Sequence, residues 1–131
     1  MIKTEIYTPK VPRTKRPYCQ GLSVKAGRLI LTSGLTARNP SGEIVSKGDI
    51  RGQTRQVLEN IRAVLEETGS SLKDIFKMTV YLRRNEDYDG MNEVRQEYFR
   101  DETFVSSTVI VELHAADALV EIEVIAVVKE V

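Results

Sequence analysis

The chain has 131 residues, of which 41% are hydrophobic and 29% charged, a composition typical of one globular domain spanning residues 1–131. Its 19 basic and 19 acidic residues cancel to a formal net charge of zero, which argues against a general nucleic-acid binder. The single cysteine, Cys19, excludes an internal disulfide. No apolar run approaches the roughly 20 residues of a membrane-spanning helix, and the N-terminus lacks the pattern of a signal peptide, so we expect a cytoplasmic protein with no membrane partner.

The charges are distributed unevenly along the chain. Residues 7–42 contain no acidic side chain, but they contain seven basic ones, namely Lys10, Arg13, Lys15, Arg16, Lys25, Arg28 and Arg38. Such a segment can attract an anionic ligand, a nucleic acid or the acidic surface of a second subunit. The alternative is a set of scattered, solvated side chains without a common partner.

The first third of the chain predicts short strands separated by turns. Residues 3–7 form a candidate strand, and the prolines of residues 8–17 keep that segment extended. Residues 28–33 read as a buried strand that ends at Ser33-Gly34. The turn at residues 39–42 then leads into a short strand over residues 43–45.

The remainder of the chain alternates helices and strands. Asp49 is a suitable N-cap for a helix over residues 50–68, and Gly69 is a suitable stop. The apolar stripe of this helix comprises Val57, Leu58, Ile61, Val64 and Leu65. The further predicted elements are a strand at 75–82, a helix at 86–100, weakened by Gly90, and strands at 108–113 and 119–129.

This order predicts an α+β fold with two layers, in which two helices cover one face of a mixed sheet of about six strands. The strand before the first helix and the strand at 75–82 would be joined by a right-handed crossover if they are parallel neighbours. The uncovered face would then expose apolar side chains such as Ile125 and Val127, for which self-association is the simplest explanation.

The last strand places two carboxylates on one face. Because side chains alternate along a strand, Glu121 and Glu123 share a face, and the other face carries Val120, Ile122, Val124 and Ala126. One interpretation is that the carboxylate face is simply solvated, as an antiparallel sheet allows. The other is a cleft, in which neighbouring carboxylates are suited to proton transfer or to orienting a water.

Other catalytic motifs are missing from the sequence. His114 is the only histidine and Cys19 the only cysteine, and their spacing does not suit a metal site. The glycine-rich patterns of nucleotide-binding loops and the pattern of a nucleophile elbow do not occur. We therefore expect no metal and no cofactor.

Six segments together carry a family resemblance. They are Pro17-Tyr18-Cys19-Gln20-Gly21, Leu31-Thr32-Ser33-Gly34, residues 53–61, Thr79-Val80-Tyr81-Leu82, residues 91–99 with Met91-Asn92-Glu93-Val94, and residues 120–126. In order and spacing the chain resembles the RidA family, also called YjgF or L-PSP. The resemblance implies a homotrimer of chorismate-mutase-like subunits, with an inner barrel and three clefts between subunits. It also implies hydrolysis of small enamines and imines, such as 2-iminobutanoate and 2-iminopropanoate, without metal or cofactor.

The same resemblance suggests roles for individual residues. Glu121 aligns with the glutamate that orients the water, which agrees with the cleft interpretation of the last strand. Tyr18, Ser33 and Asn92 align with cleft-lining residues. We expect Tyr18 and Ser33 to come from one region and Asn92 and Glu121 from another. Without the family, these would read as a packed tyrosine, a serine at a strand end and a surface asparagine.

The chain departs from the family at the substrate anchor. Active deaminases of the family carry an arginine before a Ser/Thr-x-Val strand, where it binds the substrate carboxylate in a bidentate manner. Here the aligned residue is Ser106, followed two residues later by Thr108, and both are candidate substrate contacts. Three basic residues are candidates for a replacement anion anchor, namely Arg13, Arg16 and Arg95. Of these, Arg95 stands where the family usually has tyrosine.

Three functions remain open from the sequence. The first is a trimeric Rid-type hydrolase with altered substrate recognition. The second is a regulatory trimer that binds a small metabolite without turnover. The third, RNA binding or cleavage, is disfavoured because the chain is neutral and few aromatic residues lie near the basic segment.

Overall fold

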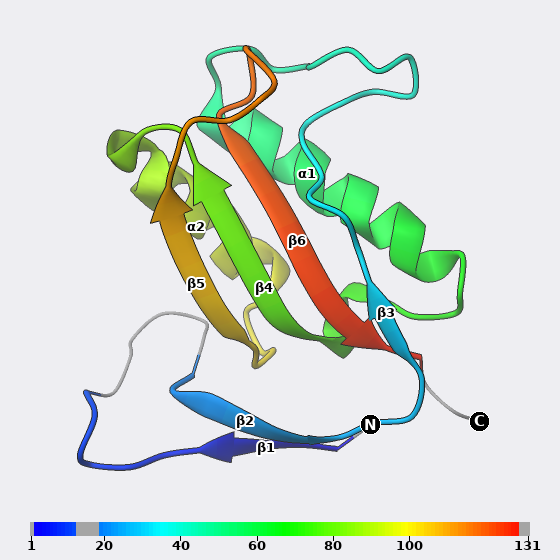
Figure 1. Ribbon diagram of the computed structural model, residues 1–131, viewed down its shortest axis with the longest axis vertical. Coiled ribbons are helices and arrows are strands. Elements are labelled where there is room, and N and C mark those ends of the chain that lie inside the picture. Colours follow the sequence, from blue (N-terminus) through cyan, green and yellow to red (C-terminus); the bar gives the residue numbers. More distant parts are fainter. Residues whose placement is uncertain (1, 13–18, 129–131) are drawn as a thin grey trace.

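The structure is a computed structural model that describes residues 2–12 and 19–128. In this part of the chain the elements alternate as the sequence predicts (Figure 1). The strands are β1 (Ile2–Ile6), β2 (Gly21–Lys25), β3 (Leu29–Leu31), β4 (Ile75–Leu82), β5 (Val105–Ile110) and β6 (Val120–Val127). The helices are α1 (Ile50–Glu66) and α2 (Tyr88–Tyr98), with 3-10 turns at Leu72–Asp74 and Asn85–Asp87.

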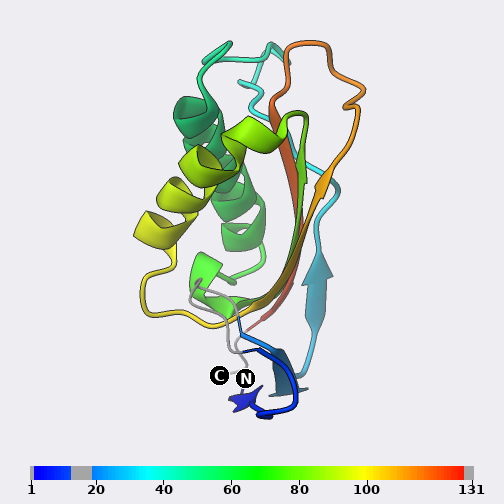
Figure 2. The ribbon, with the colours of Figure 1, turned by 90° about the vertical axis from the view of Figure 1, so that its left-hand side faces the viewer.

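The main sheet has four strands in the order β3-β6-β4-β5. Strands β4 and β5 are parallel, whereas β6 is antiparallel to both β3 and β4, so the sheet is mixed. Both helices lie on one face of this sheet and leave the other open (Figure 2). The two-layer α+β prediction is therefore confirmed.

The predicted single sheet of about six strands is wrong. The six described strands form two sheets, because β1 and β2 pair only with each other and lie apart from the main sheet (Figure 1). Most of their described side chains are exposed, so they offer little apolar surface to pack beneath the helices. The right-handed crossover was predicted only if the strand before α1 and β4 are parallel neighbours; that condition is not met, since residues 43–45 form no strand and β6 lies between β3 and β4.

Smaller differences concern element bounds. Strand β2 was not anticipated, and the segment predicted as a strand at 43–45 forms only an isolated bridge between Arg38 and Ile44. Strand β5 begins at Val105 rather than at residue 108. The bounds of β4 match the prediction at both ends.

Helix α1 begins directly after Asp49, the predicted N-cap. The Asp49 carboxylate accepts a hydrogen bond of 3.0 Å from the backbone N–H of Gly52, and Gly69 adopts a φ of +79° just beyond the helix. Four predicted stripe residues are fully buried against the sheet, namely Val57, Leu58, Ile61 and Leu65. Val64 is 43% exposed, contrary to prediction, because it lies at the margin of the stripe near the end of the helix.

Gly90 has a packing role in α2. A Cβ added at this position would lie 2.7 Å from Cγ2 of Ile50, which is closer than real side chains approach. The glycine therefore lets α2 lie close to the start of α1, and this contact offsets the weaker helix propensity of glycine.

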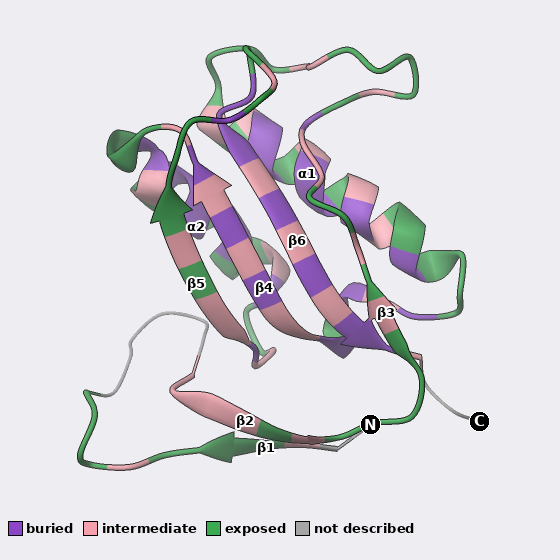
Figure 3. Cartoon of the chain, viewed as in Figure 1, coloured by how far each residue is buried: buried purple, intermediate pink, exposed green. Residues whose placement is uncertain are grey.

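The two faces of β6 differ as its alternating pattern predicts (Figure 3). Val120, Ile122, Val124 and Ala126 are buried, and Glu121, Glu123 and Ile125 on the open face are partly exposed. The prediction for Val127 is wrong, because this residue is fully buried at the strand end, where its carbonyl accepts a 2.6 Å hydrogen bond from the buried Ser70 hydroxyl. None of the helices described here is both long and apolar enough to cross a membrane.

Candidate functional site

Glu121 lies on the open face of the sheet. It is half-buried in β6, opposite Tyr81 of β4. The carboxylate of Glu121 forms no hydrogen bond or ion pair with any other residue of the described chain. Carboxylates in such a position are available to a water or to a ligand.

The neighbouring carboxylate has a partner. The Tyr81 hydroxyl donates a short hydrogen bond to Glu123, two residues from Glu121 on the same face. This hydrogen bond, followed by burial and the charges of Glu123 and Glu121, raises the pKa of Tyr81. Tyr81 therefore stays protonated and occupies Glu123, so the two carboxylates of this face are not equivalent.

The chain segment that continues from β3 lies against Glu121. Leu35 and Ile122 exchange backbone hydrogen bonds of 2.9 and 3.0 Å, which hold this segment beside β6. A Cβ on Gly34 would lie 2.9 Å from Cδ of Glu121 and would overlap its Oε2 atom. The missing side chain of Gly34 thus creates the space that the Glu121 carboxylate occupies.

A second polar group lies on the opposite, helix-covered face. The guanidinium of Arg95 is fully buried, and its Nη1 atom donates a 2.9 Å hydrogen bond to Oγ of Ser106. Its Nε and Nη2 atoms donate to Oδ1 of Asn92, at 3.3 and 2.9 Å. The guanidinium carbon also lies 5.6 Å from the ring centroid of Phe104.

Local geometry explains this grouping. Asn92 and Arg95 are three residues apart in α2 and therefore share a helix face. Ser106 pairs with the buried Met78 of β4, so its side chain points toward the helices, as does that of Thr108, which pairs with Val80. The helix and the edge strand β5 together position the cluster.

The structure thus separates the predicted site residues into two groups. Glu121 lies with Ser33-Gly34 on one side, and Asn92 lies with Arg95 and Ser106 on the other, so a single chain does not bring Asn92 and Glu121 together. Asn92 is only 2% exposed, which also excludes the surface asparagine considered as its alternative. Tyr18, Arg13 and Arg16 lie outside the described residues.

Sequence reasoning missed three contacts. The roles of Gly34 and Tyr81 beside the carboxylates depend on strand pairing, which the sequence does not reveal. The link between Arg95 and Ser106 joins a helix to a strand 11 residues later. A signal for part of it was visible, since Asn92 and Arg95 have helical i, i+3 spacing next to the apolar residues Met91 and Val94.

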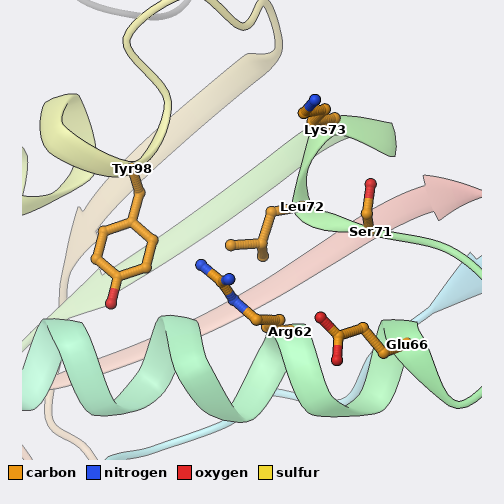
Figure 4. A pocket seen from close by; sticks show the side chains of 6 residues that line it. All are labelled: Arg62, Glu66, Ser71, Leu72, Lys73 and Tyr98. Carbon is orange, nitrogen blue, oxygen red and sulfur yellow. The ribbon is translucent and has the colours of Figure 1, made fainter.

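Distinct hollows lie near the C-terminal ends of the two helices. One of about 200 Å³ is lined by Arg62, Glu66, Ser71, Leu72, Lys73 and Tyr98 (Figure 4). The Tyr98 hydroxyl donates a 2.7 Å hydrogen bond to Glu59, and burial together with this bond raises the pKa of Tyr98 to about 12. A neighbouring hollow of about 330 Å³ shares Tyr98. Neither hollow borders Glu121 or Arg95, and their lining charges are of mixed sign, so we place the candidate site at the two polar groups instead.

Metal-ligating side chains do not converge in the described residues. Across residues 2–12 and 19–128, no three histidine, cysteine, aspartate or glutamate side chains are grouped closely enough to hold a metal ion. The polar groups near Glu121 are a phenol and a second carboxylate, which are hydrogen-bonded to each other.

Both edges of the main sheet expose apolar side chains. Leu29 and Leu31 are 49% and 66% exposed on edge strand β3, next to the side of the sheet that carries Ser33-Gly34 and Glu121. Val109, Ile110 and Val111 are similarly exposed at and beyond the other edge strand, β5, which carries Ser106. The two polar groups therefore lie toward opposite edges, each beside an exposed apolar patch.

Comparisons with known proteins identify close relatives along nearly the whole chain. A family model described as Endoribonuclease L-PSP matches residues 8–128. A RutC family protein from Pyrococcus abyssi is 45% identical over 96% of this chain and 98% of its own length. The 3-aminoacrylate deaminase RutC from Acinetobacter baylyi is 37% identical over 93% of this chain and 96% of its own length. A 2-iminobutanoate/2-iminopropanoate deaminase from Dermatophagoides farinae is 32% identical over 97% of this chain and 98% of its own length.

A solved structure shares the fold. The protein YyfB from Yersinia pestis, described as a conserved Rid family protein of unknown function, superposes with a TM-score of 0.84. The superposition covers 98% of this chain and all of the other, at 23% sequence identity. This likeness supports the arrangement of helices and strands.

Proposed function

Because the chain belongs to the Rid family, the family of the Endoribonuclease L-PSP model, we propose that it hydrolyses small enamines or imines in a cleft shared by two subunits. Two relatives support the reaction class, since one is named for an enamine, 3-aminoacrylate, and the other for two imines. The proposed products are a carbonyl compound and ammonia.

The observation that carries this proposal is the state of Glu121. Its half-buried carboxylate has no hydrogen-bonding partner in the described chain, whereas Glu123 is occupied by Tyr81. In the proposed reaction, Glu121 accepts a proton from a water whose oxygen attacks the C=N carbon. That proton passes to the nitrogen and gives a carbinolamine, in which one carbon carries a hydroxyl and an amino group. The hydroxyl proton then moves to the amino nitrogen, by way of Glu121, so that the C–N bond breaks and ammonia leaves as the C=O bond forms. An enamine would first be protonated on carbon to give the imine.

A homotrimer would bring the two polar groups together. Contact between the β3 edge of one copy and the β5 edge of the next is heterologous, and such contacts close into rings when the rotation allows. Apolar side chains exposed at both edges support this contact. In the ring, Glu121 and Ser33 of one copy would face Ser106 and Thr108 of its neighbour, so each cleft would need two chains.

The assay for this function is ammonia release from 2-iminobutanoate generated in the cuvette. We expect Glu121→Gln to lower kcat at least about 100-fold, because general-base catalysis of this kind contributes 10²- to 10⁴-fold. Glu123→Gln is the matched control on the same face and should lose less than about 10-fold. Wild-type release no faster than spontaneous hydrolysis would contradict the proposal and favour a trimer that only binds a metabolite.

Assembly is tested separately by sedimentation equilibrium. We expect a trimer at micromolar concentration whose dissociation on dilution abolishes turnover. A monomer that retains full activity would contradict the shared cleft.

A further inference from the structure

The smaller hollow, of about 200 Å³, is lined by charged side chains that do not pair with one another. Arg62 and Glu66 lie one turn apart on α1, and Lys73 lies across the hollow in the 3-10 turn that follows the helix (Figure 4). Within the described residues no ion pair joins any two of these three, and the side chains of Glu66 and Lys73 have no partner. A hollow with unpaired charges of both signs is complementary to a ligand that carries both.

The Arg62 guanidinium is held beside this hollow with its donors unused. Its carbon lies 5.8 Å from the ring centroid of Tyr98, and its Nη2 atom lies 3.5 Å from Oε2 of Glu59, which accepts the hydrogen bond from the Tyr98 hydroxyl. The Nε atom of Arg62 is buried and has no hydrogen-bond partner among the described residues. The ring and the carboxylate therefore fix the cation in place, and its N–H groups remain for an acceptor that enters the hollow.

The Glu66 end of the hollow suits a cation. Glu66 lies in the last turn of α1, where the backbone carbonyls give the helix end a partial negative charge. This turn contains no basic residue, and a second carboxylate, Glu67, follows directly. A positive group of a ligand would be attracted both by the Glu66 carboxylate and by the helix end. The hollow therefore has a negative pole at Glu66 and a positive pole at Arg62 and Lys73.

Apolar surface lies between the two poles. Figure 4 shows the side chain of Leu72 between the ring of Tyr98 and the side chain of Ser71, with the Arg62 guanidinium pointing toward it from α1. Leu72 is buried, so only its outer surface forms the floor of the hollow. The hollow is smaller than the roughly 300–1,000 Å³ of pockets for drug-sized ligands, which limits its occupant to a small metabolite.

We propose that this hollow is a second small-molecule site and that it binds an α-amino acid with an aliphatic side chain, in its zwitterionic form. The carboxylate contacts Arg62 and Lys73, the ammonium group contacts Glu66, and the side chain covers Leu72. The Cβ atoms of residues four apart on a helix are about 5–6 Å apart, so a ligand whose two charged groups share one carbon can bridge Arg62 and Glu66. The hollow lies on the helix-covered side of the sheet, so this site is independent of the proposed cleft.

The test compares L-leucine with two analogues that each lack one of its charges. Leucinamide keeps only the ammonium group, and 4-methylpentanoate keeps only the carboxylate, at about pH 6. Backbone amide NMR spectra of the full-length protein report where each ligand binds and how tightly. We expect leucine to shift the amides of Leu72 and Lys73 with a dissociation constant of about 1 mM. Each analogue should bind about 5-fold more weakly, which is the upper end for a partly exposed ion pair.

Two variants at exposed positions separate the poles. Glu66→Gln should weaken leucine and leucinamide about 5-fold without weakening 4-methylpentanoate, because only the first two carry the ammonium group. Lys73→Met should weaken leucine and 4-methylpentanoate without weakening leucinamide. The matched control is Glu67→Gln, which makes the same change at the next residue, an exposed carboxylate that does not line the hollow, and should alter none of the three affinities.

Several outcomes would overturn the inference. One is the absence of shifts at Leu72 and Lys73 with about 10 mM leucine, tenfold above the expected dissociation constant. Another is a set of shifts confined to the residues around Glu121, which would place the amino acid in the proposed cleft instead. Equal affinities for the three ligands, or equal losses in Glu66→Gln and Glu67→Gln, would show that the two poles do not recognise the zwitterion.

Discussion

The two faces of the main sheet differ in how their polar side chains are hydrogen-bonded. On the helix-covered face, the buried polar residues are bound to one another, as Arg95 is to Asn92 and Ser106. On the open face, Glu123 is bound by Tyr81, but Glu121 has no hydrogen-bonding partner in the described chain. Leaving a buried polar group unpaired costs free energy, whereas a half-buried one can still reach water. The comparison therefore shows polar side chains bonded within the chain on one face and a carboxylate open to water on the other.

The largest expected effect is a loss of stability on the covered face. Ile122→Ala should lower the free energy of unfolding by about 3 kcal/mol, because Ile122 is fully buried beneath the helices. Ile125→Ala, on the open face of the same strand, should lower the free energy of unfolding by less. Urea unfolding at low protein concentration measures both values. Equal losses of unfolding free energy in the two variants would show that the open face is buried as deeply as the covered one. That result would contradict the difference between the two faces.

The next effect is on activity at the open face. Gly34→Ala should reduce kcat about 100-fold, since the added Cβ displaces the Glu121 carboxylate and misplacement of a catalytic group by about 1 Å has this consequence. The clash is with the end of a flexible side chain, so the free energy of unfolding should fall by less than about 1 kcal/mol.

Gly21→Ala is the control for this change, because its added Cβ would meet Ile6 at an ordinary 3.7 Å. This variant should keep both activity and stability. A Gly34→Ala protein with wild-type kcat would show that the position of the Glu121 carboxylate does not matter.

A smaller effect distinguishes the two carboxylates. Tyr81→Phe should lower the free energy of unfolding by about 1 kcal/mol, because it removes the hydrogen bond to Glu123. In a double-mutant cycle with Glu123→Gln, most of that energy should appear as coupling. The same cycle with Glu121→Gln should show clearly less coupling, and equal values would mean that Tyr81 serves both carboxylates.

The smallest effect is a pH dependence away from both faces. Tyr98 has its pKa raised from 10.0 to about 12 in the folded protein, by burial and by its bond to Glu59. Between these pH values the folded state keeps a proton that the unfolded state releases, so stability falls as the pH rises. Tyr98→Phe should therefore flatten the decline in the free energy of unfolding from pH 10 to 12. An identical slope in both proteins would contradict this assignment.

Much of the fold follows from local patterns in the sequence. The bounds of β4, the cap of α1 at Asp49 and the two faces of β6 were all predictable, because each depends on residues close together in the chain. Glu121 was also identifiable as a candidate from its pattern, since a carboxylate in an otherwise apolar strand requires an explanation. Val127 shows the limit of the pattern, because it is fully buried at the end of β6 although alternation assigns it to the open face.

Only the tertiary structure decided which residues meet. The sequence gives the positions of Gly34, Asn92 and Arg95 but not their contacts. The contact of Gly34 with Glu121 depends on the chain after β3 running beside β6. Likewise, the bond from Arg95 to Ser106 depends on how α2 packs on β5. Side-chain periodicity is a local property, whereas strand order and helix packing follow from burial of the whole apolar surface. For this reason the sequence pattern indicated the face of most strand residues, whereas the fold determined their partners and the burial of exceptions such as Val127.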